Sequence, residues 1–134
     1  MLCLLKKVLT LWIKANPNPC NKESLDCVVR AISIALNLSW YQVFDELCAV
    51  AREDCNMPSA DEVWGHYLYL RGFEPFLLPK ECPRCITIRD FADIFHDGIY
   101  IIGTGHHAVC VMFGNYFDSW DSGSEVPSFF WRII

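Results

Sequence analysis

The chain has 134 residues, is 53% hydrophobic and 14% aromatic, and carries a formal net charge of -5 at pH 7. These values predict one domain, residues 1–134, with enough apolar side chains to bury a core, and they exclude intrinsic disorder. The acidic balance argues against a nucleic-acid-binding surface, which needs clustered Lys and Arg. No apolar run approaches the roughly 20 residues of a membrane span, so we expect no membrane insertion.

The eight cysteines would indicate a disulfide framework in a short secreted chain. The start of the chain does not fit a secretory signal, because Lys6-Lys7 interrupts the apolar run and no small-residue cleavage site follows. Several cysteines also occupy apolar positions, such as Cys48 and Cys110. We therefore expect a cytoplasmic protein whose cysteines are mostly reduced and buried.

Polar residues with capping chemistry divide the first half of the chain into helices. Residues 8–14 suit an opening strand or a short helix, and the Pro and Asn residues from 16 to 21 predict a turn. Three helices are then predicted: one from a cap at Ser24 or Asp26 to Asn37, one from a capping box at Ser39 to about Arg52, and one from a capping box at Ser59 to near Gly72.

The second half of the chain is predicted to be mostly strand. The exception is a short helix that Thr87 and Asp90 open and that runs through Phe95. The predicted strands are residues 73–78, which Pro75 confines to a sheet edge, 99–103, 107–113, 116–120 and 129–134. Gly114-Asn115 predicts a two-residue hairpin turn. Helices first and antiparallel strands last predict an α+β domain.

Cys27 lies where the first turn of the first predicted helix begins. A thiol is nucleophilic as the thiolate, and both a helix N-terminus and a nearby imidazolium favour that form. One cysteine among eight is more often a buried core residue. Its position upstream of a histidine-bearing strand makes Cys27 the candidate nucleophile.

His107 opens the predicted strand 107–113, and from the end of a strand its ring can reach a helix terminus packed across the sheet. It is therefore the candidate general base. Alternation places His107, Val109 and Val111 on one face of the strand, and Ala108 and Cys110 on the other. His106 points the opposite way and is the weaker candidate.

Asp118 lies on the partner strand and is the candidate that orients the imidazole, with Asp121 as its competitor. A turn at 114–115 sets Val111 opposite Asp118. That register leaves His107 about 13 Å along the ladder, at about 3.3 Å per residue. A bulge, a longer turn or strand twist has to close this gap if Asp118 is to orient the ring.

An acyl-transfer site also needs hydrogen-bond donors for the developing oxyanion. The backbone N–H of Cys27 is one candidate. The side-chain amide of Asn21, six residues upstream, is another, although asparagine in this segment equally suits a turn.

Cys82 and Cys85 are spaced like half of a zinc site. A tetrahedral site needs four ligands, and no second pair at finger-like spacing follows, so we expect no metal and no other cofactor. One alternative interpretation is that Cys82 and Cys85 form a redox pair. The preferred interpretation is that they are two thiols on either side of a tight turn.

Two pairs of short segments carry a resemblance to a known family. His107-Ala108-Val109 followed by Asp118-Ser119-Trp120 resembles the papain-like pattern, in which a His-Ala-Val strand precedes an Asn-Ser-Trp segment. Residues 26–31, Asp-Cys-Val-Val-Arg-Ala, and residues 117–121, Phe-Asp-Ser-Trp-Asp, are similar to segments of small phage and bacterial papain-like proteins related to bacteriocin-processing peptidases. The resemblance covers roughly residues 16–123.

The resemblance implies a papain-like fold, with N-terminal helices packed on a C-terminal antiparallel sheet. It also implies a cysteine peptidase or amide hydrolase with Cys27, His107 and Asp118 as its triad, acting on a peptide or protein in the cytoplasm, or in the host cytoplasm for a phage protein. Asp118 stands where papain-like enzymes have an asparagine, and Asn21 stands at the offset of their oxyanion-hole glutamine. Two alternatives stay open: a cell-wall amidase or endopeptidase, and a papain-like binding protein without catalysis.

Overall fold

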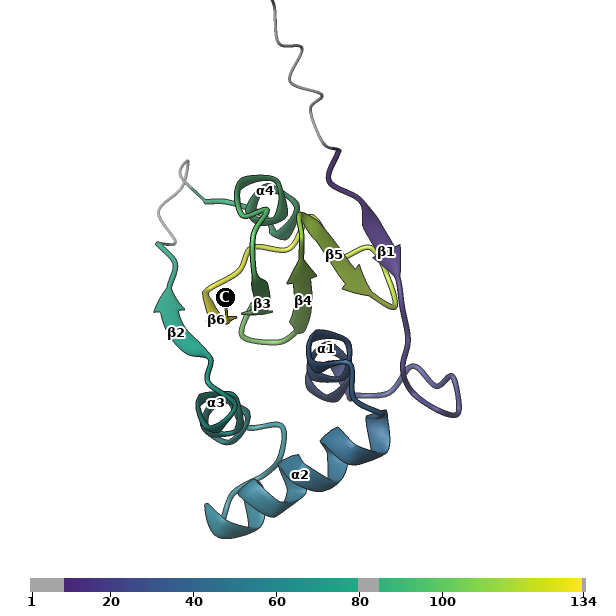
Figure 1. Ribbon diagram of the computed structural model, residues 1–134, viewed down its shortest axis with the longest axis vertical. Helices are drawn as coiled ribbons and strands as arrows, with labels where there is room; N and C mark the ends of the chain where they lie inside the picture. Colours follow the sequence, from purple (N-terminus) through teal and green to yellow (C-terminus); the bar gives the residue numbers. More distant parts are fainter. Residues whose placement is uncertain (1–8, 80–84, 134) are drawn as a thin grey trace, which may run out of the picture.

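The computed structural model describes residues 9–79 and 85–133, which form an α+β domain (Figure 1). The helices are α1 (Cys27–Leu36), α2 (Trp40–Glu53), α3 (Asp61–Leu70) and α4 (Ile88–Ile94). The strands are β1 (Trp12–Lys14), β2 (Glu74–Leu77), β3 (Ile99–Gly103), β4 (Ala108–Met112), β5 (Asn115–Asp118) and β6 (Phe129–Ile133). The predicted α+β class is confirmed, with most of the helices preceding most of the sheet.

Most of the predicted helix boundaries are confirmed by their capping geometry. Asn37 ends α1 in the left-handed conformation, and the Ser39 hydroxyl accepts the backbone N–H of Gln42 at the start of α2. Thr87 and Asp90 form a complete capping box on α4. The cap predicted at Ser59 is wrong, because α3 begins after Ala60, whose own N–H bonds the carbonyl of Met57.

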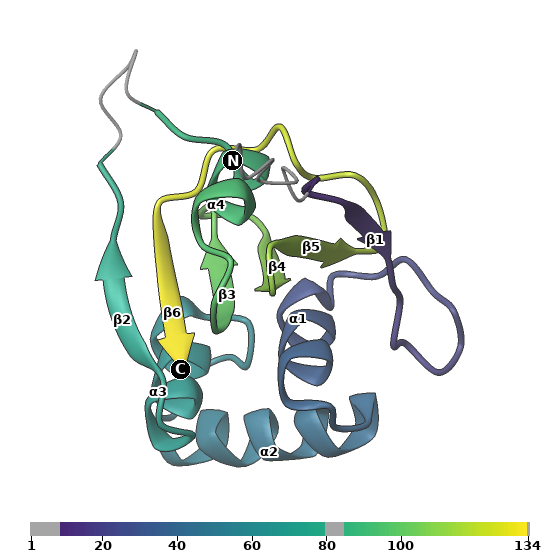
Figure 2. The ribbon, with the colours of Figure 1, turned by 45° about the horizontal axis from the view of Figure 1, so that its top comes forward.

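The described strands form one mixed, mostly antiparallel sheet in the order β1-β5-β4-β3-β6-β2. The opening segment is a strand rather than a helix, and β1 pairs in parallel with β5. For a run this short, the choice between strand and helix is set by pairing with β5, which lies about a hundred residues further along the chain. At the other edge, β2 carries Pro75, as predicted, and pairs with β6 (Figure 2).

The two faces of the sheet bury two separate cores. Helices α1 and α3 pack on one face, with α2 packed across them on their outer side, and α4 covers the other face (Figure 1). Alternation along β4 divides its side chains as predicted, because Ala108 and Cys110 join the first core while Val109 and Val111 join the second. Helix α1 packs directly against β4. The start of α1 lies close to the start of that strand, because the Ala108 backbone acts on the Cys27 thiol.

The hairpin between β4 and β5 turns one residue earlier than predicted. Phe113 and Gly114 form the turn, both with positive φ, and Met112 pairs with Asn115. Asn115 opens β5 instead, where its side-chain oxygen accepts the backbone N–H of Leu11. Gly114 is required for space as well as conformation, since a Cβ there would lie 2.5 Å from the His96 ring.

The described cysteines are mostly thiols. Cys20, Cys27, Cys48, Cys55 and Cys110 are free. Cys85 is disulfide-bonded, which corrects the expectation of a thiol at that position. Cys82 lies outside the described residues.

Within residues 9–79 and 85–133, no single helix has both the length and the apolar composition needed to cross a membrane. The helices α1 and α2 meet these two criteria only when taken together, as a pair bent by 115°.

Candidate active site

Cys27 is the first residue of α1, where the backbone N–H groups of the opening turn have no helical partners. Its side chain is half-buried. The sulfur lies close enough to the side chain of His107 and the backbone N–H of Ala108 for both groups to lower the pKa of the thiol. The helix packs against β4, and this packing brings a residue of the first helix and the residue that precedes β4 into contact.

His107 connects Cys27 to Asp118. Its Nε2 lies 2.5 Å from Oδ2 of Asp118, and its side chain is 13% exposed. That bond leaves Nδ1 as the nitrogen available to the thiol. The Trp120 ring lies 5.0 Å from the His107 ring, centroid to centroid, and covers part of the imidazole.

Asp118 ends β5, is 4% exposed, and its carboxylate accepts several hydrogen bonds. The Ser122 hydroxyl donates to Oδ2 at 2.6 Å, and the Ser119 backbone N–H donates to Oδ1 at 2.8 Å. The early turn also shortens the predicted gap. Continuing the observed register sets Asp118 two residues from His107 instead of four, or about 7 Å along the strand, which is within reach of a diagonal pair.

The electrostatics of the site favour a thiolate beside an imidazolium. Burial alone raises the pKa of Cys27, but hydrogen bonds from His107 and Ala108, with the charges of His107 and Arg30, lower it below its ordinary value. Burial likewise lowers the pKa of His107, while its bonds to Asp118 and Cys27 outweigh burial and raise it to about 9. Both shifts favour the form in which the proton is on the ring rather than on the sulfur.

A buried ion pair on α1, which sequence reasoning missed, supports this site. Arg30 is 5% exposed and pairs with Asp26, the residue before Cys27. Its other guanidinium nitrogen lies 3.8 Å from Oδ1 of Asp118. The Asp26 carboxylate also accepts bonds from Asn18 and Trp40, so it does not cap the helix. The available signal was a charged pair, four residues apart, on an otherwise apolar helix.

The remaining sequence-predicted candidates lie apart from this contact. Asp121 bonds Tyr116 and Arg89 rather than His107. His106 is exposed at the rim. Asn21 lies in the exposed loop before α1, where its side-chain oxygen accepts the Asn16 amide, and it does not line the cleft that contains Cys27. Its role as an oxyanion donor stays a prediction.

The cleft beside Cys27 has a volume of about 250 Å³. Its walls come from the start of α1, the start of α3, and the β3–β4 connection that ends in His107. Among the described residues, no group of three or more His, Cys, Asp or Glu side chains is arranged to hold a metal ion. The expectation of a metal-free site stays a prediction, since Cys82 lies outside the described residues.

Comparison of the chain with protein-family models, with curated proteins and with solved structures finds no match. The interpretation of the site therefore rests on its own geometry.

Proposed function

We propose that the protein is a cysteine hydrolase that cleaves peptide or amide bonds through an acyl-enzyme, with Cys27 as nucleophile, His107 as acid and base, and Asp118 as the group that orients His107. The observation that carries the proposal is that Asp118 is hydrogen-bonded to His107, and that His107 in turn lowers the pKa of a half-buried thiol at a helix N-terminus. A buried structural cysteine needs none of these partners, whereas a helix N-terminus and a neighbouring imidazolium each favour the nucleophilic thiolate.

In the first half of the proposed reaction, the Cys27 thiolate attacks the carbonyl carbon and forms a C–S bond, and the carbonyl π electrons move to oxygen. When the tetrahedral intermediate collapses, the C–N bond breaks and His107 gives its proton to the leaving amine. The product is a thioester and a neutral His107.

In the second half, His107 takes a proton from water, whose oxygen attacks the thioester carbonyl. The C–S bond then breaks, the acid leaves, and the thiolate–imidazolium pair is restored. Asp118 keeps the ring oriented and stabilises its charge, held in turn by Ser122 and Ser119. The Cys27 backbone N–H at the start of α1 is the nearest candidate donor for the oxyanion.

A papain-like architecture is part of this proposal. The cysteine opens a helix packed on the sheet, the histidine precedes a strand, and the carboxylate ends the next antiparallel strand. A peptide or protein is the proposed substrate. The inactive binding protein is the main alternative, and it needs the same fold without a reactive thiol.

We expect iodoacetamide at pH 7 to alkylate Cys27 about tenfold faster than Cys48 or Cys110. Cys27 has the lowered pKa, whereas complete burial raises the pKa of Cys110. Time-resolved peptide mass spectrometry measures all the thiols in one sample. If Cys27 reacts no faster than Cys48, the hydrolase proposal fails and the inactive alternative is favoured.

A further inference from the structure

A groove of about 430 Å³ extends from the Cys27 cleft toward β2, the edge strand of the sheet. Asp61 and Phe129 line both the cleft and the groove, so the two are continuous. Helix α3 lies beside β2, and the groove runs between the start of α3 and the strands β2 and β6 (Figure 2). Its other walls are Glu62, Pro75, Phe76, Leu77 and Trp131.

Two aromatic rings form the floor of the groove, and two glycines leave room for them. Phe129 and Trp131 pack on the same face of the sheet as α1 and α3. A Cβ at Gly103 would clash with the Phe129 ring, and one at Gly65 would lie 2.9 Å from the Trp131 ring. Leu77, in the wall, is 88% exposed. The groove therefore presents an uncovered apolar surface next to the cleft.

Two carboxylates line the side of the groove that α3 provides. Asp61 and Glu62 are the first two residues of α3, where the helix N-terminus stabilises negative charge. The indole N–H of Trp64, a buried residue, donates to Oδ1 of Asp61 at 3.0 Å and so orients this carboxylate where groove and cleft meet. Among the described residues, no other hydrogen bond or ion pair engages either side chain, so both can accept a donor from an occupant.

No described Lys or Arg residue lines the groove or the cleft. Arg132 packs over the ring of Phe76, which belongs to the core on the other face of the sheet. An acidic occupant would be repelled by the two carboxylates. A Lys or Arg side chain matches both parts of the groove, because its aliphatic stem can cover the aromatic floor while its charged head meets the carboxylates.

We propose that this groove binds the side chain of a Lys or Arg residue of the substrate, with Asp61 and Glu62 as the partners of its charge. The inference rests on the proposed hydrolase function, and it names the substrate class: peptides with a basic residue close to the bond that is cut. Because Asp61 lines the cleft as well as the groove, the basic residue lies within about two residues of the attacked carbonyl, at about 3.3 Å per residue.

The test uses iodoacetyl-Xaa and iodoacetyl-Gly-Xaa amides, with Xaa as Lys, norleucine or Glu. The Cys27 sulfur attacks the iodoacetyl carbon, a C–S bond forms and iodide leaves. Norleucine has the four-carbon stem of lysine without its amine, so it isolates the effect of the charge. Each rate is divided by the rate of the same probe with N-acetylcysteine amide. In at least one series, the Lys probe is expected to label Cys27 about fivefold faster than the norleucine probe, and the Glu probe is expected to be slowest.

Asp61→Asn and Glu62→Gln are each expected to lower the ratio of the Lys rate to the norleucine rate, and the double variant is expected to bring it close to one. High salt is expected to lower the same ratio in the wild type, because it screens charges near the surface. The matched controls are Asp45→Asn and Glu53→Gln, which remove the same charges from exposed positions on α2, outside the groove and the cleft. Both controls are expected to keep the ratio.

The outcomes separate this proposal from the hydrolase proposal. Selective iodoacetamide labelling of Cys27 together with equal Lys and norleucine rates, or with a Lys preference that survives in the double variant, overturns the groove assignment alone. A preference that falls as far in the Asp45→Asn and Glu53→Gln controls reports the net charge of the protein and also overturns the groove assignment. A Cys27 that reacts with iodoacetamide no faster than Cys48 overturns the hydrolase proposal, and the groove assignment with it.

Discussion

Replacing His107 with alanine is expected to slow the alkylation of Cys27 by about tenfold at pH 7 and by a larger factor at pH 6. The variant keeps the burial that raises the pKa of the thiol and loses the bond and the charge that lower it. A higher thiol pKa reduces the thiolate fraction tenfold for each pH unit below it, while the more basic thiolate is more nucleophilic and offsets part of this loss. Hydrolysis, which also needs a proton donor, is expected to fall further.

The wild type and His107→Ala are expected to differ in how the alkylation rate of Cys27 depends on pH. In the wild type, the ion pair exists between the lowered pKa of Cys27 and the pKa of about 9 of His107, so the alkylation rate is expected to be flat across that window. The stabilisation that the raised pKa of His107 contributes to the fold is fully present below about pH 6.5 and is lost as the pH rises through about 9. In His107→Ala the alkylation rate is expected to fall steadily from pH 9 to pH 6.

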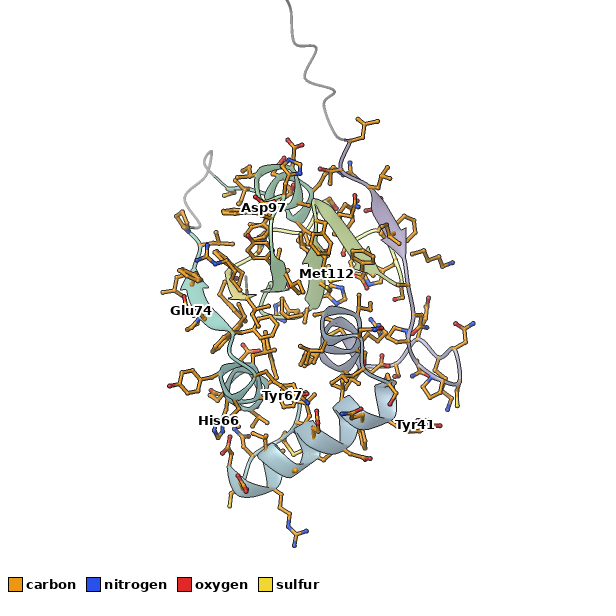
Figure 3. All side chains as sticks on the ribbon, viewed as in Figure 1. Tyr41, His66, Tyr67, Glu74, Asp97 and Met112 are labelled. Carbon is orange, nitrogen blue, oxygen red and sulfur yellow. The ribbon has the colours of Figure 1, made fainter. Side chains whose placement is uncertain are left out.

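His66→Ala is the matched control, because His66 also faces an aspartate, with Nδ1 2.9 Å from Asp54, on the outer side of the helical layer (Figure 3). It is expected to leave the Cys27 profile unchanged. Identical pH profiles for the wild type and His107→Ala, measured by stopped-flow alkylation, would remove His107 from the proposed mechanism.

The features that the sequence predicted correctly are those that depend only on residues close together in the chain, such as helix caps. The Thr87–Asp90 box and the αL residue Asn37 need no distant partner, so their prediction from sequence is confirmed. The hairpin turn was misplaced by one residue because Gly114 accepts positive φ in either register. Phe113, a poor turn residue, joins Gly114 in the turn so that Asn115 can bond the backbone of Leu11 beside β1.

In the candidate site, too, the residues set by local sequence were predictable and those set by distant contacts were not. Cys27 and His107 were identifiable because each lies at an end of an element with a clear apolar pattern. The order of the motifs led us to expect that Cys27 and His107 lie close together. It could not predict the contact of Asp118 with the His107 ring, because that contact depends on the hairpin register. Trp40 and the loop residue Asn18 donate hydrogen bonds to Asp26 of the Asp26–Arg30 pair. Contacts of this kind, between separate segments, produce no periodic pattern in the sequence.

Arg30→Met is expected to lower the free energy of unfolding by about 3–5 kcal/mol at pH 7. It leaves the carboxylates of Asp26 and Asp118, 8% and 4% exposed, without their shared buried cation. Arg71→Met makes the same substitution at a partly exposed pair with Glu46, and there a loss below about 1 kcal/mol is expected. Urea unfolding measures both variants.

The dependence on pH and on the partner distinguishes lost charge pairing from lost packing. In the wild type, burial raises the pKa of Asp26, and bonds from Asn18 and Trp40 with the Arg30 charge lower it overall, so its stabilisation is present above about pH 4 and is lost as the pH falls below. Without Arg30, the pKa of Asp26 rises, and the deficit of Arg30→Met is expected to shrink as the pH falls and the buried Asp26 carboxylate takes up a proton. Adding Asp26→Asn is expected to recover part of the deficit at pH 7, because the double variant buries one fewer unpaired charge. A deficit that is independent of pH and additive with Asp26→Asn would mean that Arg30 acts through its aliphatic packing, and the electrostatic support proposed for Asp118 would then be wrong.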